Sequence, residues 1–172
     1  MARAFLLVLL LATTGCAGDS DRESGATADS TAPPDSAFAA LQERGASPEA
    51  MGVDQYTSIH QFDDMPDGGR IELQRQVDDS LGIEQIRSHL RHIADAFAAG
   101  DFRIPAFVHD REAVPGTATM AAKRDVIRYE FRELPRGGEV RITTDDPEAL
   151  QAVHEFLAFQ RADHRAGGHE MH

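Results

Sequence analysis

Histidine and methionine are the residue types in this sequence with the clearest capacity for chemistry. The chain has eight histidines and five methionines but a single cysteine in its 172 residues. His109 is followed by the pair Pro115-Gly116 and then by Met120. Because imidazole and thioether groups together suit copper, this arrangement predicts a copper-type ligand pair. Core packing is the alternative role of Met120.

Two further histidines are placed to complete an internal site. His60 alternates in phase with Phe62 along a predicted strand, so both side chains should point to the covered face. A hydrogen-bonded core histidine is the alternative for His60. His89 and His92 have the i, i+3 helical spacing that lets two imidazoles reach one ion. His89 lies at the margin of the apolar stripe, whereas His92 and His154 should face solvent. The predicted internal ligands are therefore His60, His89, His109 and Met120.

The C-terminal tail, residues 165–172, holds a second group of potential ligands. It contains a Gly-Gly pair and ends in His169-Glu-Met171-His172. Imidazole and thioether groups on a flexible tail would suit capture of copper or another late transition metal. A polar terminus with no role is the alternative, because terminal tails vary freely.

Catalytic motifs are scarce in this chain. The sequence has no G-x-S-x-G, no phosphate-binding glycine loop, no H-E-x-x-H and no cysteine nucleophile in the predicted domain. We therefore predict no catalytic residues and do not favour an enzyme.

The first residues predict export. Arg3 precedes an apolar run from Ala4 to Ala12, so residues 1–15 indicate a signal peptide. The run is too short to span a bilayer as a helix. Residues 13–16, Thr-Thr-Gly-Cys, resemble a bacterial lipobox with threonine where leucine is usual. In that motif the cysteine, here Cys16, is lipidated and becomes the new N-terminus.

The predicted cellular location and the net charge limit the kinds of partner that this protein can bind. Lipidation at Cys16 predicts a lipoprotein held to a cell-envelope membrane, with its domain in the periplasm or at the cell surface. Loss of Arg3 with the leader changes the formal net charge from −12 to about −13. This negative charge excludes nucleic acid as a partner, because it repels phosphate groups. It also opposes electrostatic binding to anionic lipids, so we expect the lipid on Cys16 to hold the protein at the membrane. Another envelope protein remains a candidate partner.

Composition divides the mature chain into a tether and one domain. Residues 16–48 are small, polar and proline-containing, and we predict a disordered tether there. Residues 49–164 have the size of a single domain with one core. The mature domain has no second cysteine and so no disulfide.

An internal repeat predicts the fold of that domain. Residues 62–71 align without a gap with residues 131–140, and both segments contain Phe, Pro-x-Gly-Gly and a β-branched residue in one register. Proline and glycine at these positions favour a hairpin turn between two strands. An amphipathic helix follows each hairpin, one after Asp79 up to Gly100 and one from Pro147 to about His164.

We therefore predict an α+β fold of two ββα repeats. The four strands should form an antiparallel sheet with the two helices packed on one face. Residues 104–109 are predicted as a short edge strand, since Pro105 would be costly in a central strand. Residues 117–124 should form one or two helical turns.

Three segments carry a resemblance to a family of small bacterial proteins, several of them exported. They are HLRHIADAFAAGDFRIP (89–105), VPGTATM (114–120) and LPRGGEVRITTDDPEALQAVHEFLAFQ (134–160). The resemblance implies a compact domain and brings no catalytic residues. Some members carry the label aspartate carbamoyltransferase, but the S-T-R-T and H-P-x-Q motifs of that longer, cytosolic enzyme are absent here.

The sequence thus favours a lipid-anchored envelope protein that binds copper or a similar transition metal for handling or buffering. The alternative is a non-catalytic module that binds an envelope protein or a small ligand without metal.

Overall fold

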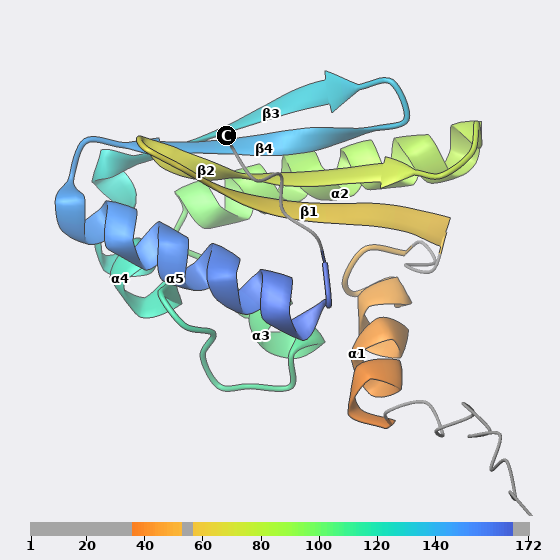
Figure 1. Ribbon diagram of the computed structural model, residues 1–172, viewed down its shortest axis with the longest axis horizontal. Coiled ribbons are helices and arrows are strands. Elements are labelled where there is room, and N and C mark those ends of the chain that lie inside the picture. Colours follow the sequence, from red (N-terminus) through yellow and green to blue (C-terminus); the bar gives the residue numbers. More distant parts are fainter. Residues whose placement is uncertain (1–35, 53–56, 167–172) are drawn as a thin grey trace, which may run out of the picture. The chain divides into compact units, whose positions relative to one another are not determined.

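The computed structural model describes residues 36–52 and 57–166, all of which belong to one compact unit, Pro33–His172. A four-stranded antiparallel sheet has the order β1-β2-β4-β3 (Figure 1). Its strands are β1 (Ser58–Met65), β2 (Gly68–Arg75), β3 (Ile127–Leu134) and β4 (Gly137–Thr144). The register places Phe62, Ile71, Val140 and Phe131 in one row across the sheet. The predicted α+β fold of two ββα repeats is confirmed, and β2 and β4 join the repeats at the centre.

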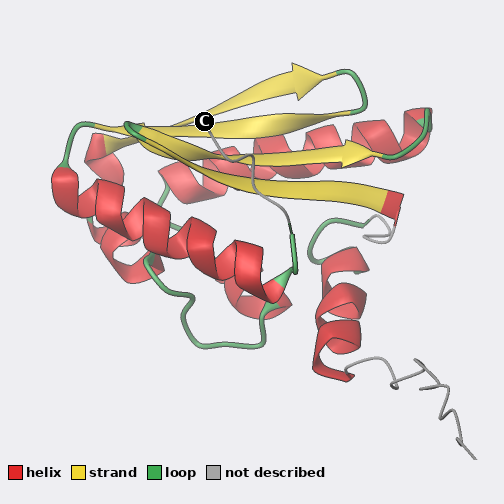
Figure 2. Ribbon diagram, in the orientation of Figure 1, coloured by secondary structure: helices red, strands yellow, loops and turns green. Residues whose placement is uncertain are grey.

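Two long helices cover one face of the sheet, α2 (Ser80–Ala98) and α5 (Pro147–Asp163) (Figure 2). Asp79 and Asp146 cap their N-termini, because each carboxylate accepts a backbone N–H of the first turn. Each helix packs mainly on the hairpin of the other repeat: α2 on β3 and β4, and α5 on β1 and β2. This exchange brings the end of α5 beside β1.

The core lies between the sheet and these helices. Its sheet residues alternate along the strands and its helix residues recur with helical spacing. They include Phe62, Ile71, Leu73, Ile127, Val140, Ile142, Ile86, Leu90, Phe97, Val153, Phe156 and Leu157. The opposite face of the sheet is charged, and its central guanidinium, Arg70, lies 2.6 Å from a carboxylate oxygen of Asp63.

The predicted edge strand over residues 104–109 is wrong. Residues Arg103–Val108 form helix α3, and the sheet has no strand there. Pro105 fits because it stands in the first helical turn, where backbone N–H groups have no intrahelical acceptor. The Asp101 carboxylate accepts the Arg103 backbone N–H at 3.0 Å, which supports that turn. The predicted turns at 117–124 are present as α4 (Thr117–Ala122) and the 3-10 helix η2 (Arg124–Val126).

The predicted tether also ends earlier than residue 48. Helix α1 (Ser36–Ala46) belongs to the folded unit, and its residues Leu41 and Gly45 are buried one turn apart. Arg44 Nε donates to the Val108 carbonyl at 2.8 Å. The domain therefore includes α1 and begins before residue 49.

Several predictions concern residues outside the described part of the chain. These are the signal peptide, Cys16 and the tail ligands His169, Met171 and His172. Within the ranges that the structure describes, no helix is long and apolar enough to cross a membrane.

Candidate functional site

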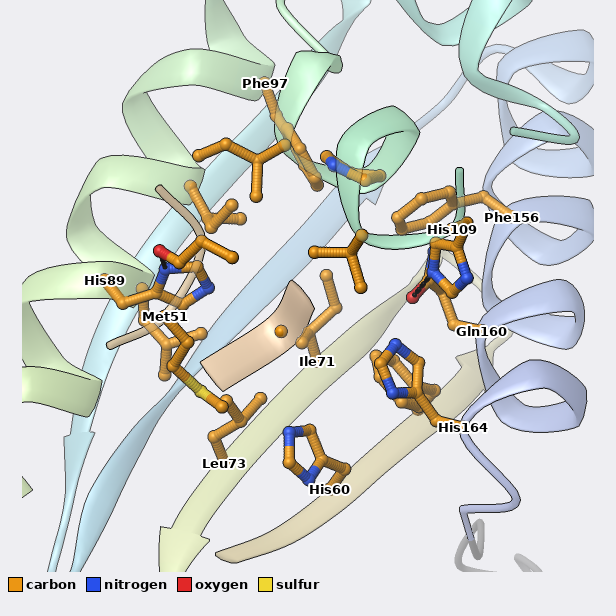
Figure 3. A pocket seen from close by; sticks show the side chains of 18 residues that line it. Met51, His60, Ile71, Leu73, His89, Phe97, His109, Phe156, Gln160 and His164 are labelled. Atoms are coloured by element: carbon orange, nitrogen blue, oxygen red, sulfur yellow. Dashed lines mark hydrogen bonds between the residues drawn. The ribbon is translucent and has the colours of Figure 1, made fainter. Parts of the chain in front are cut away.

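Four histidines line one cavity of about 80 Å³ at the end of the sheet–helix core. They come from four different parts of the chain (Figure 3): His60 from β1, His89 from α2, His109 from the residue after α3, and His164 from the residue after α5. Most of the other lining residues are apolar, among them Met51, Ile71, Leu73, Phe97 and Phe156. The cavity is therefore an apolar space with imidazoles on its walls.

Three of the imidazoles form a continuous group. The ring centres of His60 and His164 are 5.6 Å apart, with an angle of 8° between the ring planes. The ring centres of His164 and His109 are 5.0 Å apart, and those rings are nearly perpendicular at 83°. Figure 3 shows these three rings on the β1 and α5 side of the cavity, and His89 on the α2 side.

Hydrogen bonds fix His109 more firmly than the other rings. Its Nδ1 lies 2.5 Å from Oδ2 of Asp163, and its Nε2 lies 3.0 Å from Oε1 of Gln160. The carboxylate accepts the Nδ1 proton and so determines the orientation of the imidazole. The remaining nitrogen, Nε2, then carries a lone pair and accepts a hydrogen bond from Gln160 when the amide oxygen and nitrogen of Gln160 are exchanged, which also gives a partner to the otherwise unsatisfied Gln160 Nε2.

His89 is held by the segment that follows α1. Its Nδ1 donates to the Ala50 carbonyl at 2.9 Å, which seats Ala50 and Met51 against the cavity. Burial lowers the pKa of His89 from 6.5 to about 4, opposed by the hydrogen bond to Ala50 and aided by the positive charge of nearby His92.

Burial lowers the pKa of two more cavity histidines. The pKa of His60 is about 4, mainly through desolvation and also through charge repulsion from His89. The pKa of His164 lies well below 6.5, through desolvation and repulsion from His60 and His109. At neutral pH the rings of His60, His89 and His164 are therefore uncharged and keep a lone pair on one nitrogen.

The structure brings together three of the four predicted internal ligands. His60, His89 and His109 line the same cavity, but Met120 does not. Met120 is fully buried in the core, which is the alternative role that its sequence position allowed. As the side chains stand, no group of three or more His, Cys, Asp or Glu within residues 36–52 and 57–166 is arranged to hold a metal ion.

The two histidines predicted at the surface behave differently. His92 is exposed as expected. His154 is half-buried, and its Nε2 donates to the carbonyls of Met65 at 3.0 Å and Gly68 at 2.9 Å. It therefore ties α5 to the turn between β1 and β2, so the surface prediction for His154 is wrong.

Sequence reasoning missed three residues of the site: His164, Gln160 and Asp163. A signal for two of them was present, since Phe156, Gln160 and His164 follow one another at intervals of one helical turn. Phe156 was expected to face inward, so the same face continues to Gln160 and His164. The predicted domain boundary at residue 164 obscured this continuation.

Comparisons with known proteins give no further identification. No protein family model, no curated protein and no solved structure matches this chain.

Proposed function

We propose that this protein binds a copper ion, or a similar divalent transition-metal ion, through the imidazoles of His60, His109 and His164. The observation that carries the proposal is the separation of their ring centres, 5.6 Å and 5.0 Å. Two imidazoles bound tetrahedrally to one ion, with metal–nitrogen bonds of about 2.0–2.1 Å, have ring centres about 5 Å apart. His164 therefore has the ring spacing to each of His60 and His109 that two ligands of a shared ion require.

Metal binding needs a change of ring orientation. The planes of His60 and His164 are nearly parallel, so at least one ring must turn for both to direct a nitrogen at the same point. His164 is suited to this because it lies beyond the last residue of α5. Within the described residues its ring makes ring contacts but no hydrogen bond. Rotation of His164 therefore breaks no hydrogen bond of its ring within the described residues, and it rearranges the ring contacts with His60, Phe62 and His109.

The electrostatics of the cavity support the same conclusion. A metal ion binds neutral imidazole, and burial keeps His60 and His164 neutral well below pH 7. Asp163 holds the Nδ1 side of His109, as carboxylates commonly do for metal-binding histidines. Nε2 of His109 then becomes a ligand when Gln160 turns its amide away.

This proposal includes the cell-envelope location that the predicted signal peptide indicates. A domain attached through lipidated Cys16 would bind the ion at the cell envelope, for handling or buffering. His169, Met171 and His172 would form a separate outer capture site on the tail.

The test is a copper titration against a competing chelator, on a chain that begins at Ala17 and ends at Ala166. Removing residues 167–172 excludes the tail ligands. We expect one equivalent to bind, and we expect His164→Gln to weaken binding by at least a hundredfold. His92→Gln is the matched control, because His92 is an exposed histidine of α2. Binding that is equal in wild type and His164→Gln, or binding only when the tail is present, would contradict an internal site.

The walls of the cavity favour a second candidate, a small apolar ligand bound without metal. The volume of about 80 Å³ is roughly half that of an engineered apolar cavity that takes up benzene. Such a ligand would insert only a small group beside Met51 and Leu73. Heat released on adding small alkanols to the chelator-treated chain, and lost in Leu73→Phe, would support this candidate.

A further inference from the structure

The imidazole-lined cavity holds a second kind of potential ligand, the thioether of Met51. Of the three methionines that the structure describes, Met51 is the only one among the residues that line this cavity. Its side chain is buried and extends from the side of the cavity where His89 lies toward the side of His60 (Figure 3). Met51 therefore places a sulfur atom in the wall that faces the proposed metal ligands.

Two hydrogen bonds hold the backbone around Met51 against the cavity. The Met51 backbone N–H donates to the Gly45 carbonyl at 3.1 Å, and the Ala50 carbonyl accepts a bond from His89 Nδ1 at 2.9 Å. The side chain has three rotatable bonds and adjoins a free volume of about 80 Å³. The sulfur can therefore turn toward an ion in the cavity while the backbone stays in place.

The cavity offers little negative charge to a bound ion. None of the described residues that line it is an aspartate, a glutamate or a cysteine. Within the described residues, the one carboxylate that is hydrogen-bonded to an imidazole of this cavity is Asp163, on His109. The free energy cost of moving an ion from water into apolar surroundings rises with the square of its charge. A monovalent ion is therefore easier to accommodate here than a divalent one.

The available ligands favour the same charge state. Soft thioether ligands select Cu(I), and imidazole also binds copper. Cu(II) prefers a square-planar or tetragonal set of nitrogen and oxygen ligands. Among the described side chains of the wall, the amide of Gln160 is the one source of oxygen. The set of imidazoles and one thioether therefore suits Cu(I) better than Cu(II).

We propose that the metal site takes its copper as Cu(I), with the thioether of Met51 completing the ligand set of His60, His109 and His164. This inference rests on the proposed function and adds to it the charge state of the ion and a fourth ligand. The copper enters as Cu(I), so the site itself transfers no electron.

The test compares the affinities for Cu(I) and Cu(II), each measured against a competing chelator. The chain begins at Ala17 and keeps its full C-terminus, with the tail ligands replaced by His169→Gln, Met171→Leu and His172→Gln. Cu(I) is titrated without oxygen in the presence of ascorbate, and Cu(II) is titrated in air. We expect Met51→Leu to weaken Cu(I) binding by about tenfold or more and to leave Cu(II) binding unchanged, because leucine removes the thioether at nearly the same volume.

A second methionine provides the matched control. Met120→Leu should leave both affinities unchanged, because Met120 is buried in the core and does not line the cavity. The circular dichroism spectrum of each variant reports whether the fold is intact. Equal Cu(I) binding in wild type and a folded Met51→Leu, or an equal loss of Cu(I) and Cu(II) binding in that variant, would overturn the proposal. Failure of the proposed function gives a different result, in which His164→Gln leaves both copper affinities unchanged.

Discussion

Acidification should destabilise this domain through its buried histidines, and His89→Gln should reduce that effect. In the folded chain the pKa of His89 is about 4, whereas an exposed histidine in the unfolded chain has a pKa near 6.5. Between these values the unfolded state binds the proton and the folded state does not. The unfolding free energy is therefore fully present above pH 6.5 and falls as the pH drops toward 4.

The size of the effect follows from the same two values. A pKa of about 4 instead of 6.5 corresponds to about 3 kcal/mol at full protonation, since each pKa unit is worth 1.36 kcal/mol. Between neutral pH and about pH 5, His89 alone should cost the fold about 2 kcal/mol. His60 acts in the same direction with a pKa that is also about 4. Glutamine at position 89 keeps a donor for the Ala50 carbonyl and removes one titrating group.

The free energy of unfolding at about pH 7, 6 and 5 can be measured by urea unfolding, monitored by circular dichroism in the presence of a metal chelator. Wild type should lose stability steeply, and His89→Gln should lose about 2 kcal/mol less over the same range. His92→Gln is the control from the same helix and should behave as wild type, because His92 is exposed. A wild type equally stable at all three values, or a His89→Gln variant with the same loss as wild type, would refute the reasoning.

Three further substitutions test the packing that positions the site. Phe156→Ala should cost about 3–5 kcal/mol in urea unfolding, because Phe156 is fully buried between sheet and helices; a loss below 1 kcal/mol would contradict this. Gly116→Ala should lower the melting temperature by several degrees, since Gly116 has φ 79° and a Cβ there would lie 2.1 Å from the Ala152 carbonyl oxygen. An unchanged melting temperature would show that the backbone can shift. Arg70→Met should cost about 2 kcal/mol at pH 7 by removing the guanidinium that neutralises buried Asp63 and two neighbouring glutamates. A free energy of unfolding equal to that of wild type would mean that this network of charged residues does not stabilise the fold.

The sheet could be predicted because the repeat constrains it twice. Residues 62–71 and 131–140 each contain a turn signal flanked by alternating side chains, and both hairpins must have the same register. In the structure Phe62 pairs with Ile71 and Phe131 with Val140, as the alignment requires. The helices followed from their apolar spacing and capping residues, which are local signals.

The two errors in the fold arose where the local signal is ambiguous. Residues 104–109 form a short apolar run, and such a run is compatible with a strand or with a buried helical turn. Residues 36–46 contain only two large apolar side chains, Phe38 and Leu41, and the position of this helix depends on tertiary contacts such as the bond from Arg44 to Val108. Contacts of that kind cannot be inferred from composition.

Part of the candidate site could be predicted from the sequence. Strand phase placed His60 inward and the helical wheel placed His89 at the edge of the core, and both line the cavity. The sequence position of Met120 did not distinguish a metal ligand from a residue that packs in the core. The contribution of His164 depends on α5 crossing to the β1 side of the sheet, a tertiary arrangement that neither repeat specifies alone.

The most direct test of the proposed metal site is a crystal structure of the chain loaded with copper, with diffraction data collected on both sides of the metal absorption edge. The proposal predicts one anomalous peak about 2.0–2.1 Å from a ring nitrogen of each of His60, His109 and His164. A fully loaded crystal with no peak in this cavity, or with a peak bound only by the tail residues His169, Met171 and His172, would contradict it.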